Sequence, residues 1–314
     1  MFVTILICTR NRPRELEGML NSLLTPNVRE PGWEVIIVDN GSTDDTPRVC
    51  DHFQAAFPEK CRILVEARAG KSNALNAGLA HARGDVLALT DDDVLCDAGY
   101  ISGIREVFTN NSVDAAQGRV LLDFEGGRPS WLNERSAALL SLRDFGDSML
   151  DWDDNLTGAN MVVRRTVIER IGGFSPQIGA GAAGFMEDSE FSWRLRRSGY
   201  KLIYAPQILV RHQINRAQLQ KGLFLDRYFR WGRSEAYLGN ITASVWRFGV
   251  YVAKEFIFSH VASIGCVVAG NPDAAFRLRC EALHRLGFYY QHWRFATGRD
   301  LPLQSPPLLG RLEC

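Results

Sequence analysis

The chain has 314 residues, a formal net charge of zero and a hydrophobic content of 46%. This length suffices for one large domain or two modest ones, and this apolar content suffices for a sizeable core. The zero net charge argues against a dedicated nucleic-acid-binding protein. Seven scattered cysteines form no CxxC pair, which is typical of free thiols in a reducing compartment and predicts a cytoplasmic protein.

The charge is unevenly distributed along the chain. Residues 1–210 contain 22 Lys and Arg against 29 Asp and Glu, whereas residues 211–299 contain 13 against 5. An acidic front part and a basic rear part predict two surfaces with different partners. The N-terminal apolar run is too short for a signal peptide, and no run of 18 apolar residues predicts a transmembrane helix.

The first part of the chain alternates between apolar runs and helical patterns. The runs are continuously apolar, as expected of strands in a parallel sheet that helices cover on both faces. We therefore predict an α/β fold with an open, doubly wound sheet. The predicted strands are Val3–Ile7, Glu34–Val38, Arg62–Val65 and Val86–Leu89, and the helices between them are Arg14–Leu24, Thr46–Phe57 and Lys71–Arg83.

The alternation loosens after residue 94. An amphipathic helix is predicted over Glu187–Ser198, with Phe191, Leu195 and Trp193 facing inward. Beyond His212 the chain becomes helical, aromatic and rich in arginine, and its last 14 residues resemble a loose tail. The other predicted strands in this part are a strand-pair region at Asp114–Phe124, and Asn160–Arg164, Tyr200–Tyr204 and Ile208–Val210.

Polar residues follow the predicted strands at one edge of the sheet. Thr9 ends the first strand, Asp39 the second and Asp91–Asp93 the fourth, while Arg68 and Lys71 follow the third. Ligands of such sheets bind beyond the carboxyl ends of the strands. Three adjacent carboxylates repel one another unless a cation lies among them, and Mg²⁺ or Mn²⁺ with phosphate oxygens fits this need. A solvated turn or a helix cap is the alternative reading.

Two further carboxylates and a histidine are candidates for the chemistry. Glu187 and Asp188 begin a helix, where a carboxylate either caps the helix or serves as a general base. His212 ends a strand, and a lone histidine is more often structural than a ligand. Gly179–Gly184 matches GxGxxG by letter, but it does not follow the first strand of a βαβ unit. We interpret it as a loop, either mobile beside the active site or simply flexible.

Taken together, these residues resemble family 2 glycosyltransferases of the GT-A fold. The resemblance covers about residues 1–215, and the order and spacing of its pieces make it specific. The matching stretches are Ile7–Arg12, Val38–Thr43, Arg68–Gly78, Leu89–Asp93, Gly172–Phe174, Glu187–Leu195 and Gly199–Pro206, followed by His212.

The resemblance implies an inverting, hexosyltransferase-type enzyme whose donor is a nucleotide sugar, first of all a UDP-sugar. It divides the chain into a catalytic domain at 1–215, with a nucleotide-binding part at 1–93 and an acceptor-binding part at 94–215, and a helical region at 216–314. The implied donor-binding residues are Thr9, Asp39, Arg68, Lys71, Asp91 and Asp92. The implied metal ligands, for Mn²⁺ or Mg²⁺, are Asp91, Asp93 and His212. The implied catalytic base is Asp188, with Glu187 on the acceptor side.

Arg227–Trp231 resembles the (Q/R)xxRW signature of processive polysaccharide synthases, in which Trp231 would contact the acceptor. A processive synthase is therefore the first alternative function. A sugar-1-phosphate nucleotidylyltransferase is less favoured, because Thr9–Arg12 stands where its glycine-rich loop should be. A non-catalytic binding protein would not need Asp93 and Asp188 together.

The basic rear part suggests a partner of its own. Residues 216–299 interleave arginine with aromatic residues at Phe224–Trp231 and Val245–Tyr251, and Phe256–Gly270 is apolar but too short to span a bilayer. We expect peripheral contact with the cytoplasmic face of a membrane, where a lipid-linked or glycan acceptor of cell-surface polysaccharide or glycolipid synthesis would be located. Packing on the catalytic domain or a homodimer interface is the equal alternative.

Overall fold

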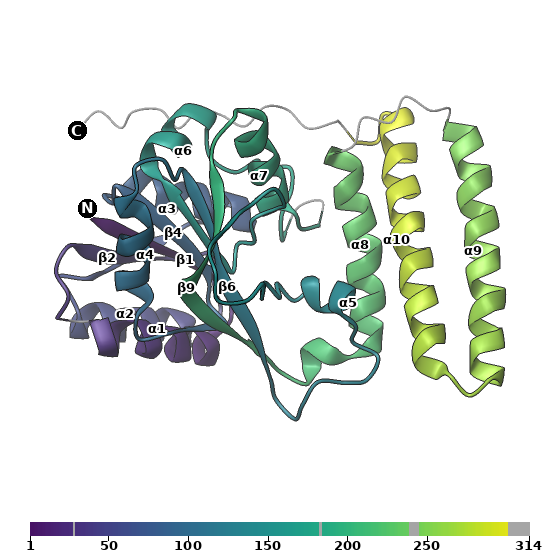
Figure 1. Ribbon diagram of the computed structural model, residues 1–314, viewed down its shortest axis with the longest axis horizontal. Coiled ribbons are helices and arrows are strands. Elements are labelled where there is room, and N and C mark those ends of the chain that lie inside the picture. Colours follow the sequence, from purple (N-terminus) through teal and green to yellow (C-terminus); the bar gives the residue numbers. More distant parts are fainter. Residues whose placement is uncertain (28, 182–183, 239–244, 301–314) are drawn as a thin grey trace.

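The computed structural model describes residues 1–27, 29–181, 184–238 and 245–300. A central sheet with helices on both faces forms one side of the molecule, and three long helices lie next to one another on the other side (Figure 1). The α/β fold with a helical C-terminal region is therefore confirmed. The tail expected at 301–314 lies outside the described residues.

The alternation of strands and helices predicted for the first part of the chain is present. Its four strands are parallel and adjacent in the order β3-β2-β1-β4. Each predicted strand is longer by one or two residues, and in β1, β2 and β4 the backbone ladder continues to the polar residue at the carboxyl end. The elements are β1 (Val3–Thr9), α1 (Pro13–Asn27), β2 (Trp33–Asp39), α2 (Thr46–Ala56), β3 (Cys61–Val65), α3 (Lys71–His81) and β4 (Val86–Asp91).

The second part of the chain continues the same sheet as β8-β6-β9-β5, with β7 beside β9. Strand β8 runs antiparallel to β4 and β6, while β6 and β9 are parallel, so the sheet is mixed. The elements are β5 (Val94–Cys96), α4 (Tyr100–Thr109), β6 (Ala115–Phe124), α5 (Glu134–Ala138), β7 (Leu150–Asp151), β8 (Asn160–Arg164), α6 (Arg165–Ile171), α7 (Glu187–Arg197) and β9 (Leu202–Ile214).

Three predictions in this part were wrong in detail. Asp114–Phe124, expected to be a strand-pair region, is the single strand β6. The strands expected at Tyr200–Tyr204 and Ile208–Val210 are one strand, because β9 bulges where the register against β6 shifts and then resumes the same ladder. Trp193, expected to face inward, is 43% exposed, with the Arg197 guanidinium over its ring. Phe191 and Leu195 occupy the buried face of α7, and residue 193 lies on the opposite face of the helix.

Apolar side chains fill both faces of the sheet in alternation. Val3, Ile5 and Ile7 of β1 pack in the cluster that includes α1 and α4, whereas Leu6 packs in the cluster that includes α3 and α7. In the second cluster Phe174 and Phe191 stack with ring centroids 4.7 Å apart. The sheet is thus fixed rigidly from both sides, which positions its carboxyl edge.

The C-terminal helices are η1 (Ala217–Leu219), α8 (Lys221–Leu238), α9 (Val245–Val268) and α10 (Pro272–Ala296), and α10 lies between α8 and α9 (Figure 1). Helices α8 and α10 approach closely at two glycines. A Cβ added to Gly232 would lie 1.8 Å from the His284 carbonyl oxygen, and one added to Gly287 would lie 2.0 Å from that of Phe229. None of the described helices is both long and apolar enough to cross a membrane.

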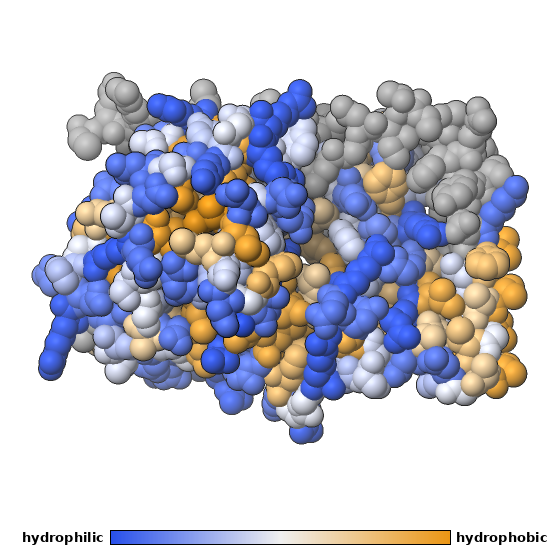
Figure 2. Space-filling view, in the orientation of Figure 1, coloured by the Kyte–Doolittle hydropathy of each residue, from blue (hydrophilic) through white to orange (hydrophobic). Residues whose placement is uncertain are grey.

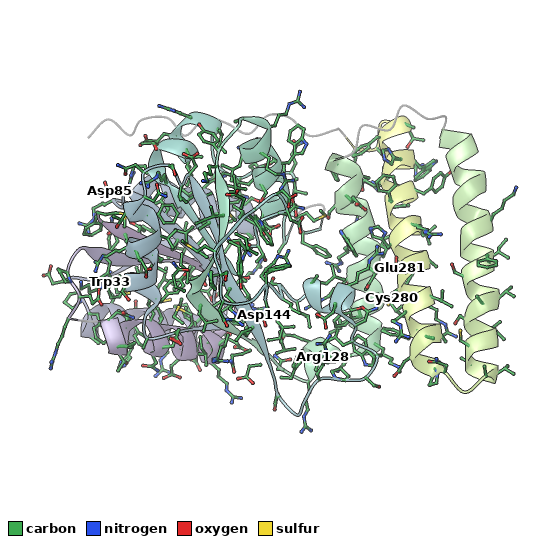
Figure 3. All side chains as sticks on the ribbon, viewed as in Figure 1. Trp33, Asp85, Arg128, Asp144, Cys280 and Glu281 are labelled. Atoms are coloured by element: carbon green, nitrogen blue, oxygen red, sulfur yellow. The ribbon has the colours of Figure 1, made fainter. Side chains whose placement is uncertain are left out.

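A third apolar cluster, which includes Cys280 of α10 (labelled in Figure 3), joins these helices to the sheet. The Trp131 ring meets Phe224 of α8 and Phe276 of α10 edge-on, with centroids 4.7 and 5.0 Å away. Ile214, the last residue of β9, belongs to the same cluster, as does Tyr228. The end of β9 is therefore packed against α8 and α10.

Candidate active site

The carboxyl ends of β1, β2 and β4 meet at one edge of the sheet. The strand register places Thr9 beside Asp39 and Cys8 beside Asp91. Asp92 and Asp93 follow directly and are almost fully buried. The strand-end residues predicted to form a site are therefore brought together by the ladder itself.

Asp92 points back toward β1. The Thr9 hydroxyl donates to its Oδ2 at 2.7 Å, and the Arg12 guanidinium donates to its Oδ1 at 2.9 Å. Burial raises the pKa of the Asp92 carboxyl to about 6, although the charge of Arg12 opposes this shift. Thr9 and Asp92, both predicted to bind the donor, thus support each other at the base of the site.

Arg12 also donates to Asp93 Oδ2 at 2.7 Å, so a single Nη1 bridges two aspartates. We did not single out this residue from the sequence, because its stretch contains two arginines and nothing distinguishes them by composition. The available signal was its position directly before Pro13, the first residue of α1. The Arg12 backbone N–H is held by the Thr46 hydroxyl at 3.0 Å, which fixes where the side chain begins.

His212 faces Asp93 from the neighbouring strand. Pairing of β5 with β9 sets Val94 opposite His212, and the imidazole Nε2 lies 3.1 Å from Asp93 Oδ1. Its Nδ1 lies 2.8 Å from the Leu140 carbonyl oxygen, to which it donates. Burial opposes the charged forms of both side chains, yet their mutual attraction lowers the pKa of Asp93 and raises that of His212.

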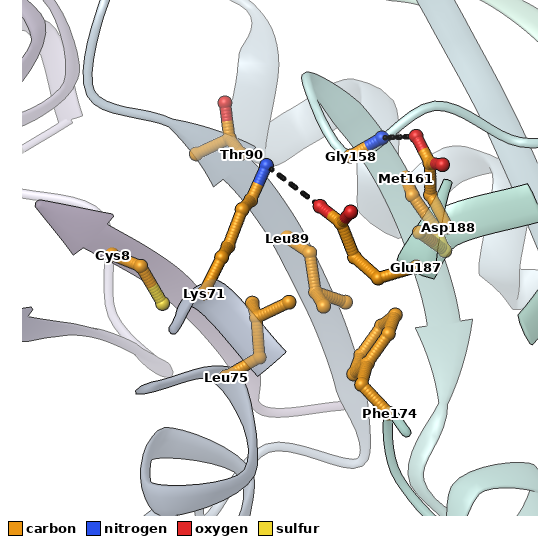
Figure 4. A pocket seen from close by; sticks show the side chains of 10 residues that line it. All are labelled: Cys8, Lys71, Leu75, Leu89, Thr90, Gly158, Met161, Phe174, Glu187 and Asp188. Carbon is orange, nitrogen blue, oxygen red and sulfur yellow. Dashed lines mark hydrogen bonds and ion pairs between the residues drawn. The ribbon is translucent and has the colours of Figure 1, made fainter. Parts of the chain in front are cut away.

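Lys71 links the strand end to the start of α7. Its Nζ lies 2.6 Å from Asp91 Oδ1 and 3.3 Å from Glu187 Oε1, and the second contact is drawn in Figure 4. Burial opposes the charge of Lys71, but the two carboxylates raise its pKa well above the ordinary value. Burial also raises the pKa of Glu187, and Lys71 opposes that shift.

Asp188 is held in a fixed orientation at the other side of the same pocket. Its Oδ2 accepts the Gly158 backbone N–H at 3.0 Å, and its Oδ1 accepts the Ser189 N–H at 2.7 Å (Figure 4). A Cβ added to Gly158 would lie 3.2 Å from Lys71 Nζ and 3.9 Å from Asp188 Oδ2. Glycine at 158 therefore keeps the space between the ammonium and this carboxylate open.

Asp39 and Arg68 lie apart from this pocket. The Asp39 carboxylate is buried and accepts the Ser42 N–H at 2.9 Å, whereas the Arg68 side chain is 71% exposed and pairs with Glu66 at 2.8 Å. Asn40, which we had not identified, donates to the Glu66 and Arg68 carbonyls and accepts the Gly70 N–H. The signal for it was an amide directly after a strand-end aspartate, a position suited to bracing a loop.

Trp231 of α8 packs against residues of the helical region and of the segment before it. Its ring packs against His284 of α10 at 4.4 Å between centroids, and the Arg135 guanidinium lies over it at 5.2 Å. The side chain belongs to the packing of α8 with its neighbours. Its assignment to the acceptor stays a prediction.

The glycine-rich loop lies directly beside the site. The Lys71 N–H donates to the Ala180 carbonyl at 3.0 Å, and the Ser72 hydroxyl donates to that of Ile178 at 2.8 Å. At its other end the Phe185 N–H donates to Ser234 Oγ of α8 at 3.2 Å. The loop thus contacts the start of α3 and the C-terminal helices, and it leads into α7.

The carboxylate and imidazole side chains at the site fit a hard divalent cation. Among the residues that the structure describes, no three His, Cys, Asp or Glu side chains are preassembled as a metal cluster. Mg²⁺ and similar ions, however, are usually held by one or two carboxylates and completed by substrate phosphates. Asp91 and Asp93 supply such carboxylates, and the buried Nε2 of His212 makes no hydrogen bond of good geometry. The bond from Nδ1 to a carbonyl is the usual orienting partner of a ligating histidine.

Comparison with known proteins defines the class. Residues 4–172 match the family model described as glycosyl transferase family 2, and the chain belongs to this family. It is a glycosyltransferase with a GT-A fold. The resemblance inferred from the motifs is thereby confirmed.

Individual relatives agree with this class. The chain is 26% identical over 243 residues to a glucosyl-dolichyl phosphate glucuronosyltransferase of Haloferax volcanii, covering 75% of this chain and 76% of that one. It is 30% identical over 223 residues to a pre-mycofactocin glycosyltransferase of Mycobacterium tuberculosis, covering 69% of this chain but only 44% of the relative. The structure of a mannosyltransferase from Pyrobaculum calidifontis with GDP-Man and Mn²⁺ superposes with a TM-score of 0.62 at 20% identity, covering 95% and 88% of the two chains.

Proposed function

We propose that the protein transfers a hexose from a nucleoside diphosphate sugar, first of all a UDP-sugar, to an acceptor hydroxyl with inversion. The observation that carries this proposal is that the Lys71 ammonium links the carboxylate at the end of β4 to the carboxylate at the start of α7. Lys71 contacts Asp91 at the strand edge and Glu187 beside Asp188. In this proposal residues 1–93 bind the donor, residues 94–215 bind the acceptor and residues 216–314 form a helical region.

The donor side of the site consists of the buried strand ends. We assign Asp39 to the nucleoside, Lys71 to the diphosphate, and Asp91, Asp93 and His212 to Mn²⁺ or Mg²⁺. The bound cation would stabilise the negative charge of the leaving nucleoside diphosphate. Thr9, Arg12 and Asp92 hold this edge in shape, because Asp92 accepts hydrogen bonds from both Thr9 and Arg12.

The acceptor side consists of Asp188 and Glu187. Asp188 takes the proton of the acceptor hydroxyl, whose oxygen forms a bond to the anomeric carbon. The bond from that carbon to the diphosphate oxygen breaks, and the diphosphate leaves with the electron pair. Because attack and departure occur on opposite faces of the sugar, one displacement inverts the centre. The backbone N–H groups of Gly158 and Ser189 keep the Asp188 carboxylate aimed during this step.

We infer a glycan or lipid-linked acceptor of cell-surface polysaccharide or glycolipid synthesis, handled at the cytoplasmic side of a membrane. The relative named glucosyl-dolichyl phosphate glucuronosyltransferase aligns with 75% of this chain at 26% identity. Its name supports a lipid-linked substrate. A processive synthase would need an aromatic residue beside the acceptor. The Trp231 ring is instead packed against His284, so we do not propose processivity.

Isothermal titration with UDP, GDP and dTDP, each with and without Mn²⁺, tests the donor site. We expect UDP to bind with the highest affinity and only with the cation. Asp93→Ala should lose this metal-dependent binding, because it removes a carboxylate that faces His212. Asp97→Ala, four residues along the chain and exposed, is the matched control and should bind as the unaltered protein does. Failure of all three nucleotides to bind at millimolar concentration would overturn the proposal.

A further inference from the structure

Helix α9 exposes an apolar face at the far end of the molecule. The exposed fractions of its side chains are 63% for Ile257, 64% for Val261, 61% for Ile264 and 83% for Val268. These residues recur every three or four positions and therefore line one side of the helix. Figure 2 shows a hydrophobic area at the edge of the molecule formed by α9.

The face is wide and carries almost no charge. Phe258 and Val267, 70% and 51% exposed, flank the central row on either side and extend the face to about 180° of the helix surface. Residues 256–270 contain no Asp, Glu, Lys or Arg, and exposed Lys254 lies one turn before Phe258. A seam for pairing with one other helix is narrower, with two apolar positions in seven.

Two serines in the described part of α9 are turned inward. Ser263 is 1% exposed, donates to the Ala275 carbonyl of α10 at 3.2 Å and accepts from Arg279 Nε at 3.0 Å. Ser259 is also buried. A helix at the surface of a protein in water has the opposite arrangement, with its polar side outward. Hydrogen bonds to α10 therefore fix α9 in the orientation that presents its apolar side.

The described part of the face is small for a stable dimer interface. Specific interfaces bury about 800 Å² and 20–30 residues on each partner. The described face offers the six apolar side chains named above, fewer than such an interface needs. A bilayer requires no complementary shape, and the burial of methylene groups in it is favourable.

The charge of this part of the chain complements an anionic surface. Residues 245–299 contain seven Lys and Arg against three Asp and Glu. Basic residues near an anionic lipid surface are attracted to it. By contrast, Phe224 and Tyr228, in the aromatic stretch of α8, are buried and unavailable for such contact. The side chains of the stretch Val245–Tyr251 lie outside the described residues.

We propose that the outer face of α9 docks the enzyme on an anionic lipid bilayer, with the helix lying in the headgroup region. This proposal rests on the proposed function for its purpose, since docking brings the active site to a lipid-linked acceptor. The binding itself requires neither donor nor metal.

Sedimentation with vesicles tests the proposal on the full chain. The vesicles contain either phosphatidylcholine alone or equal parts of phosphatidylcholine and phosphatidylglycerol, at low salt. We expect binding to the mixed vesicles. The Val261→Ser/Ile264→Ser variant should bind at least about tenfold more weakly, because each replacement removes two or more methylene equivalents from the bilayer. Lys254→Glu should weaken binding to the mixed vesicles several-fold without changing an apolar residue.

The matched control is Met149→Ser/Leu150→Ser, which changes two adjacent exposed apolar residues, 57% and 44% exposed, outside α9. It should bind as the unaltered protein does. The proposal is wrong if the unaltered protein does not sediment with mixed vesicles, or if the α9 and control variants bind equally. A dimer in solution that Val261→Ser/Ile264→Ser dissociates, without vesicle binding, would assign the face to a second copy. Nucleotide titration, which involves no lipid, separately decides the proposed function.

Discussion

The carboxyl edge of the sheet and the outer face of α9 arrange their side chains in opposite ways. At the edge, charged groups are buried, with Asp92, Asp93 and Glu187 between 4% and 6% exposed. On α9, aliphatic and aromatic groups are between 51% and 83% exposed. Each arrangement is unfavourable for the isolated chain, because buried charge and exposed apolar surface both cost free energy. The two regions show that a candidate binding surface can be recognised where charged side chains are buried or apolar side chains are exposed to water.

Helix α8 and its neighbour α10 separate these regions and pack closely against each other. Phe224 is fully buried, and Gly232 and Gly287 allow close backbone contact between α8 and α10. This layer is packed as an ordinary protein core. The contrast therefore predicts that changes at the edge alter catalysis, changes in the middle layer alter stability, and changes on α9 alter localisation.

The largest expected effect is at the edge. Asp188→Asn should lower the turnover rate about 10²–10⁴-fold, because the amide cannot take the acceptor proton. Nucleotide binding should be unchanged, since Asp188 contacts backbone groups of Gly158 and Ser189 rather than the strand-end carboxylates. Steady-state kinetics and titration with UDP and Mn²⁺ measure the two properties.

Asp153→Asn, at an exposed aspartate, is the control for the change from acid to amide and should have normal turnover. Near-normal turnover of Asp188→Asn would refute the assignment of the base. Loss of nucleotide binding in this variant would place Asp188 on the donor side instead.

The middle layer should respond in stability. Gly232→Ala should lower the free energy of unfolding by about 1–3 kcal/mol, because the new methyl group would overlap the His284 carbonyl and force α8 away from α10. Gly222→Ala is a matched control on the same helix, where nothing lies within 4 Å of the added atom. It should stabilise α8 by up to about 1 kcal/mol. Urea unfolding of both variants measures the two changes in free energy. Equal effects would show that α10 tolerates a methyl group at position 232.

The smallest expected effect concerns Glu34, a buried carboxylate that pairs with an arginine of the same chain. Glu34 is fully buried and accepts hydrogen bonds from Thr4 at 2.8 Å and from the Arg83 N–H at 2.9 Å, and the Arg83 side chain lies 2.7 Å away. Burial favours its protonated form, but the bonds from Arg83 and Thr4 outweigh this effect and lower its pKa. Glu34→Gln should cost about 1–2 kcal/mol at pH 7, a modest value because the Arg83 side chain is 60% exposed.

The pH dependence of this loss has a definite sign. Because the folded pKa of Glu34 lies below its unfolded value of about 4.3, its stabilisation is complete above that value. It disappears as pH falls through the folded pKa. The difference between the unaltered protein and Glu34→Gln in urea unfolding should therefore shrink below about pH 4. A difference that grew on acidification would contradict the ion-pair explanation.

The sequence predicted most of the fold because it depends on local periodicity. Continuous apolar runs located β1, β2, β3 and β4, and the polar residue after each run located the edge of the site. The order of the sheet beyond β4 depends on contacts between distant segments, such as β8 between β4 and β6, and no local pattern specifies these. The shift of register between β6 and β9 likewise follows from tertiary packing.

The side-chain network of the site was only partly predictable. The aspartates were identified because like charges gathered in a short stretch. Arg12 and Asn40 were missed because their roles are defined by what they touch, Asp92 and Asp93 for the first and the loop to Gly70 for the second. The inward orientation of Ser263 was equally invisible, since it depends on the bond to Ala275 across two helices.

The contact between the glycine-rich loop and α8 also constrains how the chain can evolve. Gly184 has a φ of +146°, and an added Cβ would lie 2.4 Å from Ser234 Oγ, although the two residues are 50 positions apart. Any side chain at 184 would therefore require the Ser234 hydroxyl, which accepts the Phe185 N–H, or the loop itself to move. Since Asp188 lies only four residues farther on, a shift of the loop would also move the segment that leads to Asp188. We expect glycine at this position to mark those members of the family whose C-terminal helices are docked as they are here.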